Sequence, residues 1–167
     1  MRYLVIILIL SFSTLLTASP VLGFEAGHFN SIPNTLDLNL YYDGITIKYF
    51  SPTSLKLSSG AGLTFALIES RSSQEFLENP INLFLKFLYI TAYESSPEKI
   101  FSIRFCFATG FSVIGFKQMG TFLSLTPGLA FNLNNLSFAF NFGIETQILD
   151  GNTLSLWSVS METMYSF

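Results

Sequence analysis

Apolar residues recur at every second position through most of this chain, and the pattern is especially regular in its last eleven residues, WSVSMETMYSF. Bulky or apolar side chains stand on one parity, and mostly small or polar side chains stand between them. Because successive side chains of a β-strand point to opposite faces, the alternation predicts a strand with one oily face. Chain ends usually fray in water, so an oily strand reaching the last residue predicts an apolar cover for that face.

The most apolar internal segment, IFSIRFCFATGFSVIGF at 100–116, follows the same period. Its odd positions carry mostly Phe, Ile and Val, whereas its even positions are mostly small or polar. A period of two with aromatic and β-branched enrichment indicates a strand rather than a membrane-spanning helix. The segment 81–93 alternates less cleanly, so a helix is kept there as the weaker alternative.

Applied to the whole chain, the alternation predicts eight strands, at 34–42, 45–51, 54–68, 82–93, 100–116, 121–133, 136–148 and 153–167. Turn-forming residues separate them, at Asp43-Gly44, Ser51–Thr53, 69–81, Glu94–Lys99, Gln118–Gly120, Asn134-Asn135 and 150–152. Asp-Gly and Asn-rich pairs tolerate the positive φ of tight hairpins. The spacing therefore predicts consecutive antiparallel hairpins.

Folding the chain at these turns brings apolar residues opposite one another. The turn at 43–44 would pair Tyr42 with Ile45, and the turn at 134–135 would pair Phe131 with Phe138. Directly opposed residues share a face of the sheet, so the oily stripe continues from strand to strand.

Either a second sheet or lipid must cover this stripe. Its many aromatic and Leu side chains would overfill the interior of an eight-stranded barrel, while the small residues of the other face fit inside one. The sequence therefore predicts an all-β, eight-stranded antiparallel up-and-down transmembrane β-barrel. A soluble, exported lipocalin-like carrier of an apolar ligand remains an alternative.

The start of the chain has the pattern of a signal peptide. Arg2 is followed by an apolar run from Leu4 to Leu16 and then by small residues, with Gly23 as the expected cleavage point. The run is shorter than the roughly 17–25 residues that a spanning helix requires. We expect residues 1–23 to be a signal peptide and 24–167 to form a single β-barrel domain.

Composition excludes several function classes. The chain is 50% hydrophobic but only 11% charged, and its net charge of −3 comes without a basic patch, so we expect no nucleic-acid partner. Its single cysteine, Cys106, cannot form an internal disulfide. We expect no cofactor, because neither Cys/His metal spacing nor a Gly-rich phosphate loop is present.

The ending resembles the terminal strand of small bacterial outer-membrane β-barrels, which typically finish on Phe after alternating aromatic or apolar residues. The predicted strand count and the signal-like start agree with the same resemblance. The matching residues are Trp157, Val159, Met161, Tyr165 and Phe167, and Thr163 departs from the pattern. The resemblance implies location in the bacterial outer membrane, contact with its lipid, and recognition of this strand by the barrel-assembly machinery.

Six charged residues are expected in the barrel interior: Asp37, Lys56, Lys86, Arg104, Glu145 and Glu162. Three positive and three negative charges balance, and unpaired charges in a narrow interior are costly. The sequence therefore predicts a structural plug, with a narrow pore as the alternative.

An enzymatic role is not predicted, because a nucleophile needs a neighbouring base and the only histidine, His28, is expected near the mature N-terminus and off the strands. A structural or interaction role in the outer membrane is predicted instead. With both termini periplasmic, the polar segment 69–81 would face outward as a contact for an extracellular partner. Pro52 should shorten the second strand, so the first hairpin is expected barely to clear the membrane.

Overall fold

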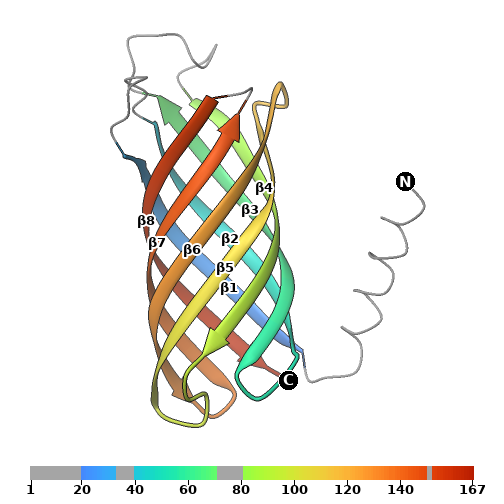
Figure 1. The fold of residues 1–167 in the computed structure, drawn as a ribbon, viewed down its shortest axis with the longest axis vertical. Helices are drawn as coiled ribbons and strands as arrows, with labels where there is room; N and C mark the ends of the chain where they lie inside the picture. Colours follow the sequence, from blue (N-terminus) through green and yellow to red (C-terminus); the bar gives the residue numbers. More distant parts are fainter. Residues whose placement is uncertain (1–19, 33–39, 71–80, 150–151) are drawn as a thin grey trace, which may run out of the picture.

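The structure, a computed structural model, describes residues 20–32, 40–70, 81–149 and 152–167 of the chain. These residues form a closed antiparallel barrel in which every strand pairs with its neighbours in sequence and β1 pairs with β8 (Figure 1). The strands are β1 (Val21–Ser31), β2 (Leu40–Pro52), β3 (Leu57–Ser70), β4 (Ile81–Glu94), β5 (Phe101–Ile114), β6 (Gln118–Leu133), β7 (Leu136–Leu149) and β8 (Asn152–Ser166). The predicted fold class and strand count are confirmed.

Alternation along each strand sorts the side chains between the outside and the lumen. Along the first half of β5 the exposed residues are Phe101, Ile103, Phe105 and Phe107, and the buried ones between them are Ser102, Arg104, Cys106 and Ala108. The barrel therefore has an apolar exterior and a lumen of small, polar and charged residues. Such an exterior suits lipid rather than water.

The two ends of the barrel differ in what they carry. The lower end in Figure 1 holds the first residue of β1, the C-terminus, and the connections at 53–56, 95–100 and 134–135. The upper end holds the turn at 115–117 and the points where β1, β3 and β7 finish. We use "lower" and "upper" in this sense throughout.

The first predicted hairpin is wrong. Asp43 and Gly44 are not a turn but lie inside β2, where Gly44 pairs with Gly27 on β1 and with Ala66 on β3. A Cβ atom on Gly44 would lie 3.0 Å from the Cβ of Ala66 and 3.3 Å from the carbonyl oxygen of Phe65. Gly44 thus permits close packing inside the barrel, a tertiary requirement that overrides the local turn preference.

β1 takes the place of the strand predicted at 34–42 as the neighbour of β2. It alternates Gly23, Glu25 and Gly27 toward the lumen with Phe24, Ala26 and His28 toward the outside. Because its outward side becomes small and polar after Phe24, it lacks the oily stripe that marks the other strands. β1 pairs with both β2 and β8 and so closes the barrel. This pairing, rather than a pattern in its own sequence, makes it a strand.

A second turn lies three residues earlier than predicted. The chain reverses at 115–117 rather than at Gln118–Gly120, with φ of 57° at Gly115 and 59° at Phe116. Gly120 is within β6, where a Cβ atom would lie 2.4 Å from the carbonyl oxygen of Ile148. The absence of a side chain at Gly120 therefore allows β7 to pack closely against β6, and it is not required by the turn.

Pro52 is the last residue of β2, and the predicted bend follows it. The expected short second strand is wrong, however, since β2 has 13 residues, more than the roughly 9–11 that span a bilayer as a tilted strand. The turn at Asn134-Asn135 lies where it was predicted. Within the described ranges, no helix has the length and hydropathy needed to cross a membrane.

Several predictions concern residues outside the described ones. These include the signal sequence up to residue 19, most of the segment 69–81, and Asp150-Gly151. The expected cleavage point after Gly23 falls within β1, so cleavage there would remove Val21–Gly23 from the strand. Cleavage itself stays a prediction.

Candidate functional site

Four charged side chains meet in the lower half of the lumen: Glu25 from β1, Lys48 from β2, Arg104 from β5 and Glu162 from β8. We call this group the lower ion network. Lys48 Nζ lies 2.5 Å from Glu25 Oε2 and 3.0 Å from Glu162 Oε1. Arg104 Nη1 donates to Glu162 Oε2 at 3.0 Å. Two cations thus neutralise two carboxylates, as buried charges require.

Neutral groups add hydrogen bonds to this network. Ser160 donates its hydroxyl to Glu25, and Asn141 Nδ2 lies 3.5 Å from Glu162 Oε2. The guanidinium of Arg104 lies 5.1 Å from the centre of the Phe50 ring, a cation–π distance. The network is therefore held from several strands at once.

A second charged pair, Lys86 and Glu145, lies above the first network, and we call it the upper ion pair. Lys86 Nζ is 2.6 Å from Glu145 Oε2 and 2.9 Å from the Tyr42 hydroxyl. Gln147 Nε2 donates to Glu145 Oε1 at 2.5 Å. The ammonium also lies 4.8 Å from the centre of the Phe29 ring. Hydrogen bonds and π-electrons thus replace the water that these charges lose.

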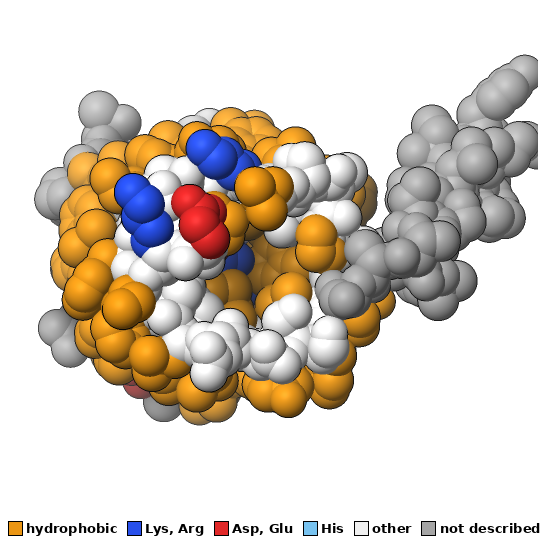
Figure 2. Space-filling view, turned by 90° about the horizontal axis from the view of Figure 1, so that it is seen from below, with side chains coloured by type: hydrophobic (Ala, Val, Ile, Leu, Met, Phe, Trp, Pro, Cys, Tyr) orange, Lys and Arg blue, Asp and Glu red, His pale blue; other side chains and the backbone are white. Residues whose placement is uncertain are grey.

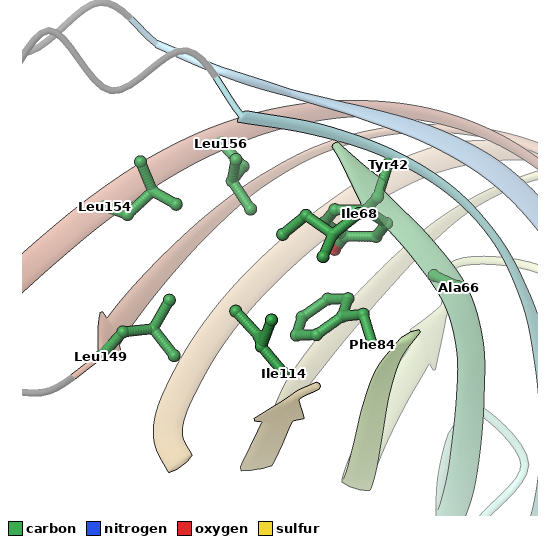
Figure 3. Close-up of a cluster of buried hydrophobic side chains, with 8 residues drawn as sticks. All are labelled: Tyr42, Ala66, Ile68, Phe84, Ile114, Leu149, Leu154 and Leu156. Atoms are coloured by element: carbon green, nitrogen blue, oxygen red, sulfur yellow. The ribbon is translucent and has the colours of Figure 1, made fainter. Parts of the chain in front are cut away.

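An apolar cluster closes the lumen above the upper ion pair (Figure 3). It consists of Tyr42, Ala66, Ile68, Phe84, Ile114, Leu149, Leu154 and Leu156, which come from β2, β3, β4, β5, β7 and β8. Figure 3 shows these side chains converging from opposite walls of the barrel. Each is almost fully buried, so apolar contacts fill the upper part of the lumen.

The lower end of the lumen is hollowed (Figure 2). A cavity of about 270 Å³ opens there, with Phe50, Arg104 and Met164 among the residues that line it. Near its rim Asn132 Nδ2 donates to Glu94 Oε1 at 2.6 Å, and Ser102 also donates to Glu94. The lower ion network stands above this cavity. Between that network and the upper ion pair lies a much smaller cavity of about 30 Å³, lined by side chains of both groups.

The structure places four of the six predicted interior charges in the lumen: Lys86, Arg104, Glu145 and Glu162, all buried. The prediction for Lys56 is wrong. This residue is exposed in the connection between β2 and β3, because β3 begins only at Leu57. Asp37 lies outside the described residues.

Sequence reasoning missed Glu25 and Lys48. Lys48 alternates with Ile47 and Tyr49 on β2, so its parity already indicated an inward side chain. Glu25 was missed because no strand was expected before residue 34. The alternation of Gly23, Glu25 and Gly27 is the signal that could have located it.

The residues expected to guide assembly lie on β8 or just after it. Val159, Met161, Tyr165 and Phe167 have outward, exposed side chains, and Trp157 shares their parity and is partly exposed. The Tyr165 and Phe167 rings meet edge to face with centres 5.0 Å apart. The backbone N–H of Phe167 donates to the Pro20 carbonyl at 3.1 Å, which ties the C-terminus to the residue that precedes β1.

His28 was expected off the strands, and this is wrong: it lies in β1 with an outward side chain. Its Nδ1 is 2.7 Å from Asp43 Oδ1 on β2. Among the described residues, no group of three or more His, Cys, Asp or Glu side chains is arranged to hold a metal ion.

Comparisons with known proteins establish the class of fold. No family model and no curated protein matches the sequence. Among solved structures, Neisserial surface protein A aligns with a TM-score of 0.65 at 9% identity, over 89% of this chain and 97% of that one. Outer membrane protein OprG from Pseudomonas aeruginosa aligns with a TM-score of 0.55 at 8% identity, over 90% of this chain and 96% of that one.

These similarities and the closed eight-stranded topology define the fold as that of small outer-membrane β-barrels. The resemblance indicated by the sequence is therefore confirmed for the fold. At 8–9% identity the similarity extends no further than that.

Proposed function

We propose that this chain is a β-barrel of the bacterial outer membrane with a structural or interaction role and a plugged lumen. The observation that carries the proposal is the filling of the lumen at three levels, by the lower ion network, the upper ion pair and the apolar cluster. Residues that pack and pair with one another stabilise a barrel without leaving a continuous path through it.

The apolar exterior supports a membrane location over the lipocalin-like alternative. A soluble carrier needs a polar exterior and an apolar cavity, whereas here Phe105, Phe107 and Phe140 are exposed and Lys48 and Glu162 are buried. Each apolar side chain facing water would forgo about 1.5–3 kcal/mol of burial. Lipid removes this cost.

The narrow-pore alternative is disfavoured by the apolar cluster and by the size of the central cavity. A cavity of about 30 Å³ has room for only one or two water molecules, since each needs roughly 10–15 Å³ of such space. We expect no steady conductance when the refolded protein is added to planar bilayers. Conductance with an ion preference that changes on reversing the charge of Arg104 would favour the pore and overturn the plug.

An enzymatic role is disfavoured because the candidate acid/base carboxylates are already paired with cations. Glu145 and Glu162, which could in principle act as an acid/base pair, each face at least one cation at 3.0 Å or less. Such pairing is typical of structural charges.

For orientation we propose that the lower end, with the start of β1 and the C-terminus, faces the periplasm and that the upper end faces outward. The proposed partner contact at 69–81 would then be extracellular, and the barrel-assembly machinery would meet β8 during insertion. An epitope inserted at Phe116-Lys117 should be accessible on intact cells, and one at Asn134-Asn135 only after the outer membrane is broken. The reverse result would overturn this orientation.

Heat-modifiability tests the membrane barrel itself. Protein refolded into detergent should migrate differently on a gel with and without boiling, because a closed barrel resists the denaturing detergent until it is heated. Membrane fractionation should recover the protein with the outer membrane. A protein that stays monomeric without detergent would favour the soluble carrier instead.

A further inference from the structure

The small central cavity of the lumen, with a volume of about 30 Å³, is reached by polar side chains from both charged groups. The lower ion network contributes Glu25 and Lys48 to its lining, and the upper ion pair contributes Lys86 and Glu145. Five hydroxyl-bearing residues also line it: Thr46, Thr64, Ser124, Thr126 and Ser158. The cavity is therefore the place where the two charged groups come nearest to a common neighbour.

The hydroxyl groups at this cavity differ in their partners. Thr46 Oγ1 and Thr64 Oγ1 lie 2.8 Å apart and bond to one another. In the part of the chain that the structure describes, the hydroxyls of Ser124, Thr126 and Ser158 have no protein partner. Polar groups inside a protein are nearly always hydrogen-bonded, either to protein atoms or to an ordered water molecule. These three hydroxyls therefore point to a ligand that can donate and accept hydrogen bonds.

A glycine leaves room for two of these hydroxyls. A Cβ atom on Gly143 would lie 2.6 Å from Ser158 Oγ and 2.9 Å from Thr126 Oγ1. Any larger residue at 143 would thus press on both groups. The strands around the cavity are built to keep the two hydroxyls close together and free to turn toward a shared partner.

The charges and the volume identify the class of ligand. Two cations and two carboxylates line the cavity and balance one another, so an ion of either sign would leave a buried charge without compensation. An apolar ligand would leave the hydroxyls without partners. A water molecule is neutral, needs two to four polar partners, and requires roughly 10–15 Å³ of such space.

We propose that this cavity is a hydration site that holds one or two water molecules. The water bonds to the hydroxyls of Thr126 and Ser158 and links the lower ion network to the upper ion pair. The two charged groups then form one continuous hydrogen-bonded core of the plug, because bridging water makes hydrogen bonds nearly as favourable as direct ones.

Nuclear magnetic resonance detects the water directly. The protein is refolded into micelles of deuterated detergent with its alanine methyl groups labelled, and transfer of magnetisation from water to each methyl is measured. The methyl of Ala108, which lines the cavity, should show a cross-peak with water. Ala139 is the control, since it is also buried but lines neither of the two lumen cavities.

Replacing one hydroxyl by a methyl group gives effects of opposite sign for a wet and a dry cavity. If water is bound, Thr126→Val removes one of its partners and should raise the equilibrium constant of unfolding about tenfold, equivalent to about 1.4 kcal/mol. If the cavity is dry, the same change removes an unsatisfied hydroxyl and should stabilise the barrel. Thr121→Val is the matched control, because Thr121 lies on the same strand with an exposed side chain.

A variant background tests whether the water links the two charged groups. In Lys86→Met/Glu145→Leu the upper charges are gone, and the water loses partners on that side of the cavity. The cost of Thr126→Val should then fall to that of the control, since coupled sites are not additive. An unchanged cost would show that the hydroxyl acts without the upper ion pair and would overturn the link.

Two results would overturn the hydration site itself. They are the absence of a water cross-peak at Ala108 and a neutral or stabilising effect of Thr126→Val. The heat-modifiable band of each variant reports folding separately, and the cross-peak is measured on the unaltered chain. The inference goes beyond the proposed plug and can fail without it: a dry cavity without conductance would overturn only the hydration site, whereas conductance with a hydrated cavity would overturn only the plug.

Discussion

Lys86 on β4 and Glu145 on β7 meet across the lumen, with Nζ 2.6 Å from Oε2, although two strands separate them along the barrel wall. Both side chains are buried. The contact therefore exists only because the sheet closes, and it links opposite walls of the barrel. Its energetic role can be measured by removing each partner.

Replacing one member of this pair should destabilise the barrel strongly. Lys86→Met leaves the Glu145 carboxylate without its cation, and breaking a buried pair in this way costs about 3–5 kcal/mol. The double variant Lys86→Met/Glu145→Leu removes both charges and should recover much of that loss. Urea unfolding in detergent or vesicles measures the difference in free energy. Single variants within about 0.5 kcal/mol of the unaltered protein would show that the pair is not important for stability.

In the lower ion network the two carboxylates should differ in importance. Glu162 faces both Lys48 and Arg104, whereas Glu25 faces Lys48 and the Ser160 hydroxyl. Glu162→Gln should therefore lower the free energy of unfolding more than Glu25→Gln, with the larger loss at about 3–5 kcal/mol. The exposed Lys56→Gln serves as the control, since surface charges usually contribute less than about 0.5 kcal/mol. Equal losses for the two carboxylates would contradict the arrangement.

Deleting Phe167 should affect assembly in cells more than it affects the finished barrel. The side chain is exposed on the outer face, so its loss removes only about 1.5–3 kcal/mol of apolar contact. We expect a strong fall in the outer-membrane level of the protein while refolding in detergent stays nearly normal. Ser166→Ala should change neither measurement. An unchanged cellular level after deletion would refute the role of Phe167 in assembly.

Gly44→Leu distinguishes a strand from a turn at this position. In β2 the new side chain would enter the lumen against Ala66, and overpacking of this kind costs about 1–3 kcal/mol. The matched change Ala61→Leu adds its bulk on the exposed outer face and should cost little. Comparison of the two urea midpoints is the measurement. A neutral Gly44→Leu would favour the turn predicted from Asp43-Gly44.

Local sequence was sufficient for the later strands of the barrel. From β5 onward each strand carries most of its bulky side chains on one parity, and Asn134 adopts the positive φ that its residue type tolerates. The same parity indicated that Lys86, Arg104, Glu145 and Glu162 point inward. These features depend on neighbouring residues in the chain, so they can be inferred without knowing the fold.

The sequence thus determined the fold class and the inward direction of most lumen charges, because strand periodicity is a local property. The count of eight agreed only because the segment around Asp43-Gly44 was divided into two strands while β1 was missed. Tertiary structure decided the identity of β1, the use of Gly44 within a strand, and the partners of each charge. Glu25 becomes a lumen residue only when β1 pairs with β8, and Arg104 reaches Glu162 only when the sheet closes with its particular stagger. Closure brings distant strands together, and a pattern with a period of two residues carries no information about that distance.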